Sequence, residues 1–360
     1  MGMKRVAING LGRIGRAFLR LYLSEEKFQQ EFDLVLINEV GELENMIYLL
    51  KYDSVYKNEV FKTIAAKIIS AEEKYLSLES FEGKEREIRF TSYREPGEII
   101  NKKIWAKYGI DIVVECTGLF TSADLAHFHL EAGAKRVVIS APSRDQKNSI
   151  YHSETVLMSI NEEKLKDSPI TSNASCTTNA AAPIIKILDE TLGVEKAILN
   201  TVHAYTSSQA LVDSPNRQDW REGRAGAQNI VPSSTGAALA VTRALNHLAG
   251  KFDGLSIRVP SIVGSIVDLT FLAKRKTSIE EVNRILENAS QEESWRGIFT
   301  FTKEELVSSD IHGSKYASIA DLRMTKVVDG NLVKVLAWYD NEIGYAQTLL
   351  LHVSKVSQIV

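Results

Sequence analysis

Cysteine is scarce in this sequence. Only two of its 360 residues, Cys116 and Cys176, carry a thiol. Two cysteines cannot build the disulfide framework on which many small secreted proteins depend. The N-terminal segment, Met1 to Asn9, is also too short and too mixed in composition to be a secretory signal peptide. We therefore expect a protein of a reducing compartment, the cytoplasm.

An excess of one charge and a long apolar run are lacking as well. The 43 basic residues nearly balance the 46 acidic ones, which gives no reason to expect a polyanionic partner such as nucleic acid. No stretch of about 18 apolar residues occurs, so no membrane-spanning helix is expected. No group of His, Cys, Asp and Glu has the local spacing of a metal site, so no metal is expected.

The composition that remains is typical of soluble globular proteins, with 44% hydrophobic and 25% charged residues. The length suffices for two domains at about 150 residues each. Because neither internal repeats nor linkers rich in Pro or Ser separate them, we expect two closely fused domains.

Short apolar runs and helical spacing alternate in the first half of the chain. Strands are predicted at 4–8, 33–37, 110–115 and 137–139, and helices after residue 12 and at 122–132. This alternation predicts an α/β fold, a Rossmann-type doubly wound parallel sheet. The Lys- and Glu-rich segment 57–90 is interpreted as more exposed strands or hairpins added to that sheet.

From about residue 171 the pattern changes. Strand-like runs rich in Val and Ile, at 258–260, 262–272 and 332–338, are interrupted by predicted helices at 180–188, 236–248 and 278–289. An α+β domain with a mixed or antiparallel sheet is therefore predicted after the first one.

The first predicted strand runs directly into a glycine-rich turn, Gly10-x-Gly12-x-x-Gly15, which opens a predicted helix. Gly10 permits the tight turn, Gly12 lets the backbone approach a pyrophosphate, and Gly15 allows helix and strand to pack closely. The helix N-terminus adds N–H groups that favour an anion. Glu39 follows the next strand, and its carboxylate can accept hydrogen bonds from ribose hydroxyls while repelling a 2′-phosphate. The pattern predicts dinucleotide binding, with NAD preferred over NADP; the alternative is an ordinary tight turn with Glu39 as a solvated charge.

Cys176 lies in a stretch of small polar residues, Ser172 to Asn179, just before a predicted helix. At a helix N-terminus, the dipole and free N–H groups lower the pKa of a thiol, as an activated nucleophile requires. On this segment alone, an inert buried cysteine is an equal alternative. Cys116, by contrast, ends an apolar strand and is interpreted as a buried structural residue.

A nucleophilic thiol needs a basic partner, and the sequence contains seven histidines. Four lie in predicted helices and two in polar, loop-like stretches, where ordinary surface or core roles are the default. His203 lies at the end of a predicted strand, 27 residues after Cys176. Spacing alone does not select His203 from the others.

Further features suit an anion. The segment Ser233 to Ala238 offers hydroxyls and N–H groups at the start of a predicted helix, although a capped helix start explains it equally well. Arg258 is a single charge in a strand-like run, and a partly buried arginine normally has a carboxylate or phosphate partner. Arg221 and Arg224 lie in a polar loop, where solvated charge is the simpler interpretation.

Taken together, these segments closely resemble the glyceraldehyde-3-phosphate dehydrogenase family. The resembling stretches, among them Asn-Gly-Leu-Gly-Arg-Ile-Gly-Arg and Ser-Cys-Thr-Thr-Asn, occur in the family's order at 7–16, 172–179, 201–206, 220–232, 234–238, 258–260 and 338–345. The resemblance implies oxidation of glyceraldehyde 3-phosphate to 1,3-bisphosphoglycerate with NAD and inorganic phosphate, a reaction of glycolysis and gluconeogenesis. It also implies a homotetramer. The implied segments are a NAD-binding domain at 1–172, a catalytic domain at 173–340, and a C-terminal helix at 341–360 that returns to the first domain.

The resemblance implies roles for individual residues as well. Cys176 would attack the aldehyde, forming a thiohemiacetal and then a thioester, and His203 would activate the thiol and accept the proton as hydride leaves. The implied cofactor contacts are Gly10, Gly12, Arg13, Ile14, Gly15, Glu39, Arg94, Ser140 and Asn341. The implied contacts of the substrate phosphate and of inorganic phosphate are Ser175, Thr177, Thr206, Arg221, Thr235, Gly236 and Arg258.

The chain departs from the family's pattern at a few places. Glu39 stands where many members have Asp, Leu239 stands where many have Lys, and the connection 144–155 is longer than usual. Ala180 replaces a frequent second cysteine, which removes an internal disulfide partner for Cys176. Two alternatives stay open: an erythrose-4-phosphate dehydrogenase, where the Ile-Asn-Glu context of Glu39 also occurs, and a non-catalytic scaffold that retains the fold.

Overall fold

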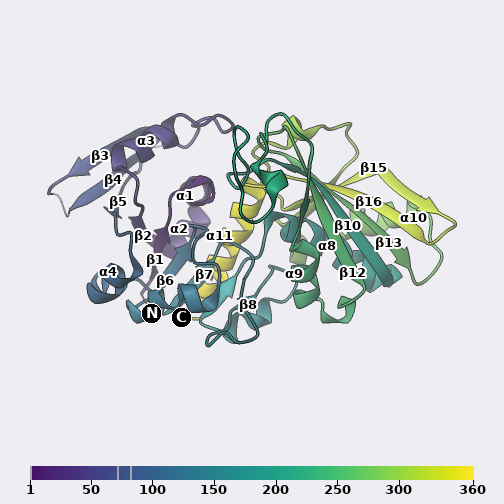
Figure 1. Ribbon diagram of the computed structural model, residues 1–360, viewed down its shortest axis with the longest axis horizontal. Helices are drawn as coiled ribbons and strands as arrows, with labels where there is room; N and C mark the ends of the chain where they lie inside the picture. Colours follow the sequence, from purple (N-terminus) through teal and green to yellow (C-terminus); the bar gives the residue numbers. More distant parts are fainter. Residues whose placement is uncertain (1, 71–72, 82) are drawn as a thin grey trace. The chain divides into compact units, whose positions relative to one another are not determined.

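The computed structural model describes residues 2–70, 73–81 and 83–360 (Figure 1). Contacts within the chain divide it into two compact units. Unit 1 comprises the residues up to 156 together with 163–173 and 349–360, and unit 2 comprises 157–162 and 174–348. Residues 157–162 belong to unit 2, whereas the boundaries expected from the sequence placed them in the first domain, 1–172. The chain returns to unit 1 at residue 349, whereas the sequence placed the start of the returning segment at 341.

In the described part of the chain, unit 1 is built on a nine-stranded sheet with the order β3-β4-β5-β2-β1-β6-β7-β9-β8. Its strands are β1 (Lys4–Asn9), β2 (Phe32–Asn38), β3 (Phe61–Ile68), β4 (Lys74–Ser80), β5 (Glu85–Thr91), β6 (Ile112–Glu115), β7 (Arg136–Ile139), β8 (Glu154–Thr155) and β9 (Ile170–Ser172). The central strands β5, β2, β1, β6, β7 and β9 pair in parallel, and β3–β4 and β4–β5 pair antiparallel. The predicted doubly wound parallel sheet is confirmed, and the Lys- and Glu-rich segment supplies its antiparallel edge.

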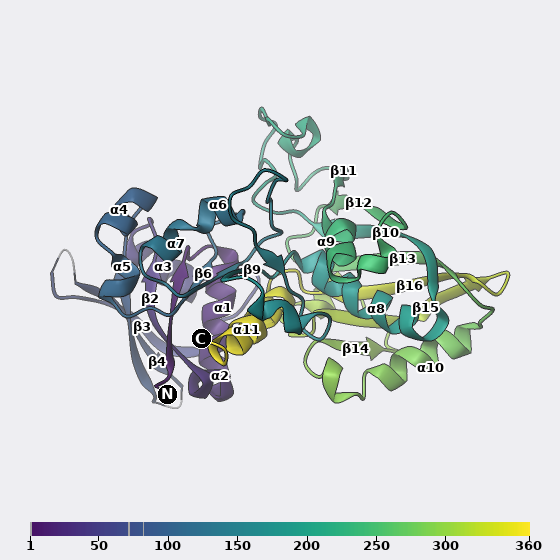
Figure 2. The same ribbon diagram turned by 90° about the horizontal axis from the view of Figure 1, so that it is seen from below.

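Helices cover both faces of this sheet, as the apolar runs of its central strands require. They are α1 (Arg13–Ser24), α2 (Glu26–Glu31), α3 (Leu43–Lys51), α4 (Pro96–Asn101), α5 (Ile104–Lys107), α6 (Ala123–Ala126) and α7 (Phe128–Glu131). On one face, Ala7 packs in a buried cluster with Trp105 of α5 and Phe128 of α7. Helix α1 lies on the other face (Figure 2), where the side chain of Ile8 faces Gly15. The single helix predicted at 122–132 is two short helices separated by His127.

Unit 2, whose residues are all described, is built on a seven-stranded sheet with the order β11-β12-β10-β13-β16-β15-β14. Its strands are β10 (Val194–Ala204), β11 (Val231–Ser234), β12 (Phe252–Val259), β13 (Ser265–Ala273), β14 (Phe299–Thr302), β15 (Ser318–Val328) and β16 (Leu332–Tyr339). The pairs β10–β12 and β14–β15 are parallel and the other pairs are antiparallel. The predicted mixed sheet is therefore confirmed.

Three helices, α8 (Cys176–Leu192), α9 (Ala237–Ala244) and α10 (Ile279–Ala289), pack on one face of the unit 2 sheet. Along β13 every second residue from Ser265 to Ala273 is buried beneath them, which is the period of a strand with one covered face. On the opposite face Ile198 and Leu255 are 64% and 47% exposed. The helix predicted at 236–248 ends at Ala244 and is followed by a short 3-10 turn.

The last helix, α11 (Ile343–Ser357), begins in unit 2 and ends in unit 1. Within unit 1 the ring of His352 contacts Thr171 Oγ1 at 2.8 Å and Asn173 Oδ1 at 3.2 Å. Because Thr171 belongs to β9, these contacts anchor the end of the chain to the strand next to the edge strand β8 of the sheet.

Candidate active site

The glycine-rich turn of unit 1 has the geometry that its spacing predicts. Gly10 adopts φ +94°, which favours glycine, and a Cβ there would lie 2.8 Å from the backbone N of Thr117. A Cβ on Gly15 would lie 2.3 Å from the carbonyl oxygen of Gly10, so helix α1 can approach β1 only without a side chain. Gly12 is the N-cap residue of α1, and apart from its neighbours in the chain no described atom lies within 4 Å of the position of its absent Cβ. The turn therefore leaves room beside Gly12 for a ligand to approach the backbone.

A cavity of about 240 Å³ opens beside this turn. Its walls include Gly10, Gly12, Glu39 and Arg94, at the carboxyl ends of β1, β2 and β5. This is the place where open α/β sheets bind nucleotides. Among the described residues no side chain caps the start of α1. The residues present thus fit a dinucleotide: an uncapped helix N-terminus, an open glycine turn, and a carboxylate.

Glu39 is held in place by its own backbone surroundings. Its Oε2 accepts a hydrogen bond from the N–H of Leu11 at 2.6 Å, and its Oε1 accepts one from the N–H of Gly41 at 2.9 Å. The carboxylate therefore ties the end of β2 to the glycine turn. A second lone pair on each oxygen is still available to accept from ribose hydroxyls.

Beneath the cavity lies a buried polar network that the sequence reasoning missed. Glu115, at the end of β6, accepts hydrogen bonds from Asn9 Nδ2 at 2.6 Å and from the N–H of Thr117 at 2.8 Å. His129 lies 3.0 Å from the same carboxylate and accepts a hydrogen bond from Trp105 Nε1 at 3.0 Å. A single carboxylate in an otherwise apolar buried strand was the available signal. The network fixes the strand ends that shape the cavity.

The other predicted cofactor residues of unit 1 differ in their settings. Arg13 Nη1 forms an ion pair with Asp53 at 2.9 Å, so much of its charge is already matched. Ile14 is half-buried in the first turn of α1, Arg94 is exposed at the cavity, and Ser140 follows β7.

Cys116 has the environment of a structural thiol. Burial raises its pKa to about 12. A thiol with so high a pKa stays protonated at neutral pH and is a poor nucleophile.

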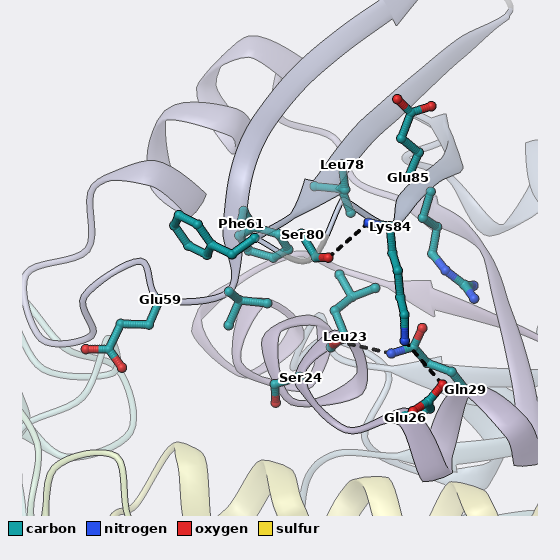
Figure 3. Close-up of a pocket in the computed structure, with 13 residues that line it drawn as sticks. Leu23, Ser24, Glu26, Gln29, Glu59, Phe61, Leu78, Ser80, Lys84 and Glu85 are labelled. Carbon is teal, nitrogen blue, oxygen red and sulfur yellow. Dashed lines mark hydrogen bonds and ion pairs between the residues drawn. The ribbon is translucent and has the colours of Figure 1, made fainter.

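A second cavity of unit 1, of about 740 Å³, lies elsewhere, between the ends of α1 and α2 and strands β3 to β5 (Figure 3). Its cations are matched locally: Lys84 pairs with Glu26 at 3.2 Å and Arg86 pairs with Asp33 at 2.9 Å. The glycine-turn cavity offers backbone N–H donors at the uncapped start of α1 and open space beside Gly12. It is therefore the better nucleotide site.

In unit 2, Cys176 is the first residue of α8. Ser175 caps the helix, because its Oγ accepts a hydrogen bond from the N–H of Thr178 at 3.1 Å. Ala174, just before it, is fully buried and adopts φ +55°, a left-handed conformation that costs a non-glycine residue free energy. Tyr345 holds this strained residue by donating to its carbonyl oxygen at 3.0 Å. The sequence analysis placed the start of this helix at residue 180, and the cap by Ser175 starts it four residues earlier, at the thiol itself.

His203 is the histidine that the structure brings to Cys176. It lies at the carboxyl end of β10, and its Nε2 is 3.3 Å from the Cys176 sulfur. Its Nδ1 lies 2.7 Å from the carbonyl oxygen of Ala204 and 2.7 Å from Nη1 of Arg258. Arg258 occupies the position opposite His203 in the parallel β10–β12 register. Three chain segments distant in sequence thus form one cluster of thiol, imidazole and guanidinium.

The electrostatics of this cluster differ from the prediction for the thiol. Burial raises the pKa of Cys176, and the opposing effects of Arg258 and of the N–H groups of Thr177 and Cys176 itself do not reverse it. The expectation of a lowered thiol pKa was therefore wrong for the site without ligands, because desolvation outweighs the helix terminus. Burial, reinforced by the Arg258 charge, lowers the pKa of His203 to about 3. The imidazole is neutral at physiological pH, the form that can accept a proton.

Tyr339, a residue to which the sequence assigned no role, links the thiol's helix to the sheet. Its hydroxyl lies 2.9 Å from Thr177 Oγ1 and 2.8 Å from Thr201 Oγ1, and Thr201 donates onward to the carbonyl oxygen of Ile266 at 3.2 Å. Burial raises the pKa of Tyr339, so it keeps its proton. Since each hydroxyl has one hydrogen and Thr201 donates its own to Ile266, Tyr339 donates to Thr201. This chain fixes the first turn of α8 beside the end of β10.

Three further predicted residues of unit 2 lie just after β10 and at the start of α9, where the threonines form local hydrogen bonds. Thr206 follows β10 with its hydroxyl 3.0 Å from Ser208 Oγ. Thr235 and Gly236 lie at the start of α9, where Thr235 Oγ1 accepts from the N–H of Ala237 at 3.2 Å.

Arg221 lies on an exposed 3-10 turn with its guanidinium bound to Asp219, so its position matches a paired surface charge. Asn341 is buried, and its Oδ1 accepts hydrogen bonds from the N–H of Gly264 and from Ser265 Oγ. Its Nδ2, for which no hydrogen-bond partner lies among the described residues, is the half of the amide that can donate to a ligand carbonyl.

Two features are absent among the described residues. No group of three or more His, Cys, Asp or Glu residues is placed to hold a metal ion there. Nor does any helix in that part of the chain have the length and apolarity to cross a membrane.

Comparison with known proteins agrees with this arrangement. Residues 4–123 match the family described as glyceraldehyde 3-phosphate dehydrogenase, NAD binding domain, and residues 175–341 match the C-terminal domain of the same enzyme. The chain is 40% identical over 346 residues to glyceraldehyde-3-phosphate dehydrogenase of Buchnera aphidicola, covering 96% of both chains. It is 42% identical over 347 residues to that of Xanthobacter flavus and 38% identical over 347 residues to glyceraldehyde-3-phosphate dehydrogenase B of Aspergillus oryzae, again with 96% of each chain covered. The chain therefore belongs to the glyceraldehyde-3-phosphate dehydrogenase family of oxidoreductases, with NAD as its cofactor.

Proposed function

We propose that this protein oxidises glyceraldehyde 3-phosphate to 1,3-bisphosphoglycerate, with NAD and inorganic phosphate as co-substrates, in the cytoplasm. The observation that carries the proposal is the contact of Cys176 with the neutral His203 at 3.3 Å, in the unit that matches the family's C-terminal domain. Thiol and base at this distance are the pair that covalent catalysis on an aldehyde requires.

The chemistry begins at the sulfur of Cys176. His203 Nε2 accepts the thiol proton, and the thiolate adds to the aldehyde carbon to form a thiohemiacetal. Donation from the resulting imidazolium to the carbonyl oxygen stabilises the charge that develops there. When bound, NAD supplies the acceptor for the hydride that leaves this carbon. The same histidine takes up the hydroxyl proton in that step, and the product on the cysteine is a thioester.

The thioester retains the free energy of oxidation until inorganic phosphate attacks it and releases the acyl phosphate. We assign Ser175, Thr177, Thr235 and Gly236 to inorganic phosphate, and Thr206, Arg258 and Arg221 to the substrate phosphate. Of these, Arg258 has the strongest support, because it is half-buried and, among the described residues, no carboxylate pairs with it. Arg221 has the weakest, since Asp219 already binds its guanidinium.

On the cofactor side, we assign the pyrophosphate to the turn formed by Gly10, Gly12 and Gly15, and the adenosine half to Arg13, Ile14 and Glu39. Arg94 and Ser140 would make further cofactor contacts, and Asn341 would donate to the nicotinamide carboxamide. The uncapped start of α1 and the open position at Gly12 support the assignment of the turn.

The test is an assay of nicotinamide reduction by the purified full-length protein. We expect turnover with glyceraldehyde 3-phosphate and NAD that depends on phosphate or arsenate, and little turnover with NADP. Absence of turnover with every aldehyde offered would reject the enzymatic proposal in favour of a scaffold. Turnover with erythrose 4-phosphate that needs no phosphate would reject the assigned substrate.

A further inference from the structure

The carboxylate of Glu115, buried at the end of β6, faces hydrogen-bond donors on both sides. Its Oε2 accepts from Asn9 Nδ2 at 2.6 Å and lies 3.0 Å from His129 Nε2. Because Trp105 Nε1 donates to His129 Nδ1, that nitrogen carries no hydrogen, so the ring hydrogen is on Nε2 and points at Glu115. On the other side, Oε1 accepts from both the N–H and the hydroxyl of Thr117. Four donors therefore converge on one carboxylate.

From Glu115 the hydrogen bonds continue across the neighbouring strands β1 and β2. Asn9 Oδ1 accepts from Asn38 Nδ2 at 2.8 Å. Asn38 in turn binds the backbone of Tyr93, because its Nδ2 donates to the carbonyl oxygen at 2.9 Å and its Oδ1 accepts from the N–H at 2.8 Å. The hydroxyl of Thr91, in β5, donates to the same Oδ1 at 2.9 Å. We call the chain Glu115–Asn9–Asn38 the strand-end ladder.

The hydrogen bonds of the strand-end ladder can run in one direction only. The N–H and C=O of Tyr93 fix the amide orientation of Asn38, since a backbone group cannot exchange donor for acceptor. Asn38 then presents an N–H to Asn9, whose own N–H is left facing Glu115. At the other end, the backbone N–H of Thr117 also faces Glu115. The side chain at position 115 must therefore offer an acceptor on each side, as a carboxylate does.

A neutral amide at position 115 cannot satisfy the strand-end ladder. Glutamine has nearly the same shape as glutamate, but it carries one oxygen and one NH2 group. With the NH2 group toward Asn9, two donors meet, and rotating the Asn9 amide only moves the conflict to Asn38. With the NH2 group toward Thr117, it meets a backbone N–H. Each orientation leaves a buried donor without an acceptor, which destabilises the local arrangement.

The strand-end ladder lies behind the walls of the glycine-turn cavity. Four of the residues that it joins line this cavity: Asn9, Asn38, Tyr93 and Thr117. Glu39, which we assign to the ribose, directly follows Asn38. Among the described residues that line the cavity, neither Glu115 nor Thr91 occurs, and their exposed fractions are only 2% and 8%. An effect of these two residues on a ligand would therefore act through the walls.

We propose that Glu115 is a positioning residue for NAD, which holds the walls of the glycine-turn cavity at the spacing that the adenosine half needs. Walls that are already in place when the cofactor arrives need not be ordered on binding, which favours affinity. The inference rests on the proposed function, because that function places the adenosine half in this cavity. Since Cys176 and His203 belong to unit 2, the rate at saturating NAD should not depend on Glu115.

The test compares purified full-length variants in their binding of NAD and of ADP-ribose, which contains the adenosine half without nicotinamide. Glu115→Gln removes the carboxylate, and Thr91→Val removes one donor to Asn38 while keeping the side-chain shape. Glu131→Gln, at an exposed residue of α7, is the matched control for the lost charge. Ile110→Ala, in the buried core before β6, is the control for lost stability. Calorimetric titration gives Kd, steady-state assays give KM and kcat, and urea denaturation gives stability.

Glu115→Gln should raise Kd for both ligands, and KM for NAD, about tenfold, with kcat within about twofold of the wild type. Thr91→Val should raise the same constants about threefold, and it decides the question should Glu115→Gln fail to fold. Both controls should bind like the wild type, although Ile110→Ala is less stable. Wild-type affinities in folded Glu115→Gln and Thr91→Val would overturn the inference. So would an equal loss of affinity in Ile110→Ala, which would trace the effect to stability alone.

The binding measurements need neither aldehyde nor phosphate, so they separate this inference from the proposed function. A protein that shows the expected losses of affinity but oxidises no aldehyde would reject the proposed function and leave the role of Glu115 standing. A loss of affinity for NAD without one for ADP-ribose would place the effect at the nicotinamide half and contradict the inference.

Discussion

At the scale of single residues, the two cysteines show how environment gives one side chain two chemistries. Burial raises the pKa of both thiols. The thiolate of Cys176 is stabilised by the Arg258 charge and by the N–H groups at the start of α8, whereas the group that opposes burial at Cys116 is the Ser140 hydroxyl. Cys176 also has a neutral imidazole at 3.3 Å, whereas Cys116 faces the carboxylate of Glu115, which raises its pKa further. Reactivity therefore belongs to Cys176.

Exchange of each thiol for a hydroxyl tests this assignment. Cys176→Ser should lower kcat for aldehyde oxidation by about a thousandfold or more, because a serine hydroxyl is far harder to ionise beside the same base. Cys116→Ser should retain turnover, since its sulfur plays no part in the reaction. Steady-state nicotinamide reduction measures both, and equal losses in the two variants would refute the assignment of the nucleophile.

At the scale of elements, the turn between β1 and α1 combines two glycines with different tasks. Gly15 is needed by the protein itself, because a side chain there would collide with the Gly10 carbonyl. Gly12 is not needed by the protein, since the space beside it is open. A glycine that the fold does not require, but that a bound pyrophosphate does, is typical of a dinucleotide-binding turn.

Alanine substitutions separate these tasks. Gly15→Ala should destabilise the protein by about 2–3 kcal/mol through overpacking between helix and strand. Gly12→Ala should change the free energy of unfolding by no more than about 1 kcal/mol, while weakening NAD binding about tenfold or more, because its methyl group occupies the approach to the backbone. Chemical denaturation and NAD titration provide the two readouts. Normal NAD affinity in Gly12→Ala would place the pyrophosphate elsewhere.

The docking of α11 on β9 makes the stability of the protein depend on pH. Burial lowers the pKa of His352 to about 3 from an ordinary value of 6.5. Above pH 6.5 the histidine is neutral in both the folded and the unfolded chain and has no effect. As the pH falls below 6.5, the unfolded chain takes up a proton that the folded chain refuses, so stability is lost, by about 2 kcal/mol between pH 6.5 and pH 5.

Replacement of this histidine should therefore flatten the acid side of the stability profile. His352→Gln keeps a donor and an acceptor near Thr171 but cannot titrate. Its free energy of unfolding should fall less between pH 6.5 and pH 5 than that of the wild type, by up to that same amount, as measured by urea denaturation at each pH. His203 is unchanged in both proteins, so its own titration cancels in the comparison. Parallel profiles would show that His352 is not neutral in the folded state.

At the scale of the whole molecule, the face of the unit 2 sheet opposite α8, α9 and α10 stands out, because it exposes apolar side chains. Apolar side chains on this face, Ile198 and Leu255 among them, are largely exposed, beside a cavity of about 530 Å³. Large exposed apolar patches are typical of sites where proteins associate. If the chain forms the homotetramer that the family resemblance implies, we expect this face to lie in one of its interfaces.

A charge on this face tests the assembly. Ile198→Lys should shift the protein from a tetramer toward smaller species, because it would bury an unpaired charge in the interface. Met3→Lys, at a residue of unit 1 exposed to 51%, is the control. Analytical ultracentrifugation gives the masses. A wild-type monomer would contradict the tetramer itself, and an unchanged tetramer in Ile198→Lys would place the interface elsewhere.

The local features of this protein were readable from the sequence alone, because they depend on residues close together in the chain. The strand–turn–helix unit at Gly10 to Gly15 and the parallel strands β1, β2, β6 and β7 follow from short-range periodicity and glycine spacing, whereas shorter or more irregular strands such as β8, β11 and β14 were not predicted. The ends of the helices were less predictable, because caps and packing decide where a helix begins and ends. The cap by Ser175 starts α8 earlier than periodicity indicated, and His127 separates two helices where periodicity predicted one.

Only the tertiary structure selected the partners of the thiol and set their charges. The sequence did not distinguish His203 from the six other histidines, and strand β10 is what places it at Cys176. Arg258 lies 55 residues further along the chain, and the pairing of β12 with β10 brings it opposite His203. The pKa of Cys176 was predicted in the wrong direction because desolvation is a property of everything packed around a group and is invisible in its neighbours along the chain. Sequence therefore determined which chemical groups this protein possesses and the elements that carry them. Folding decided which groups meet and which of them are ionised, because both depend on contacts between segments distant in the chain.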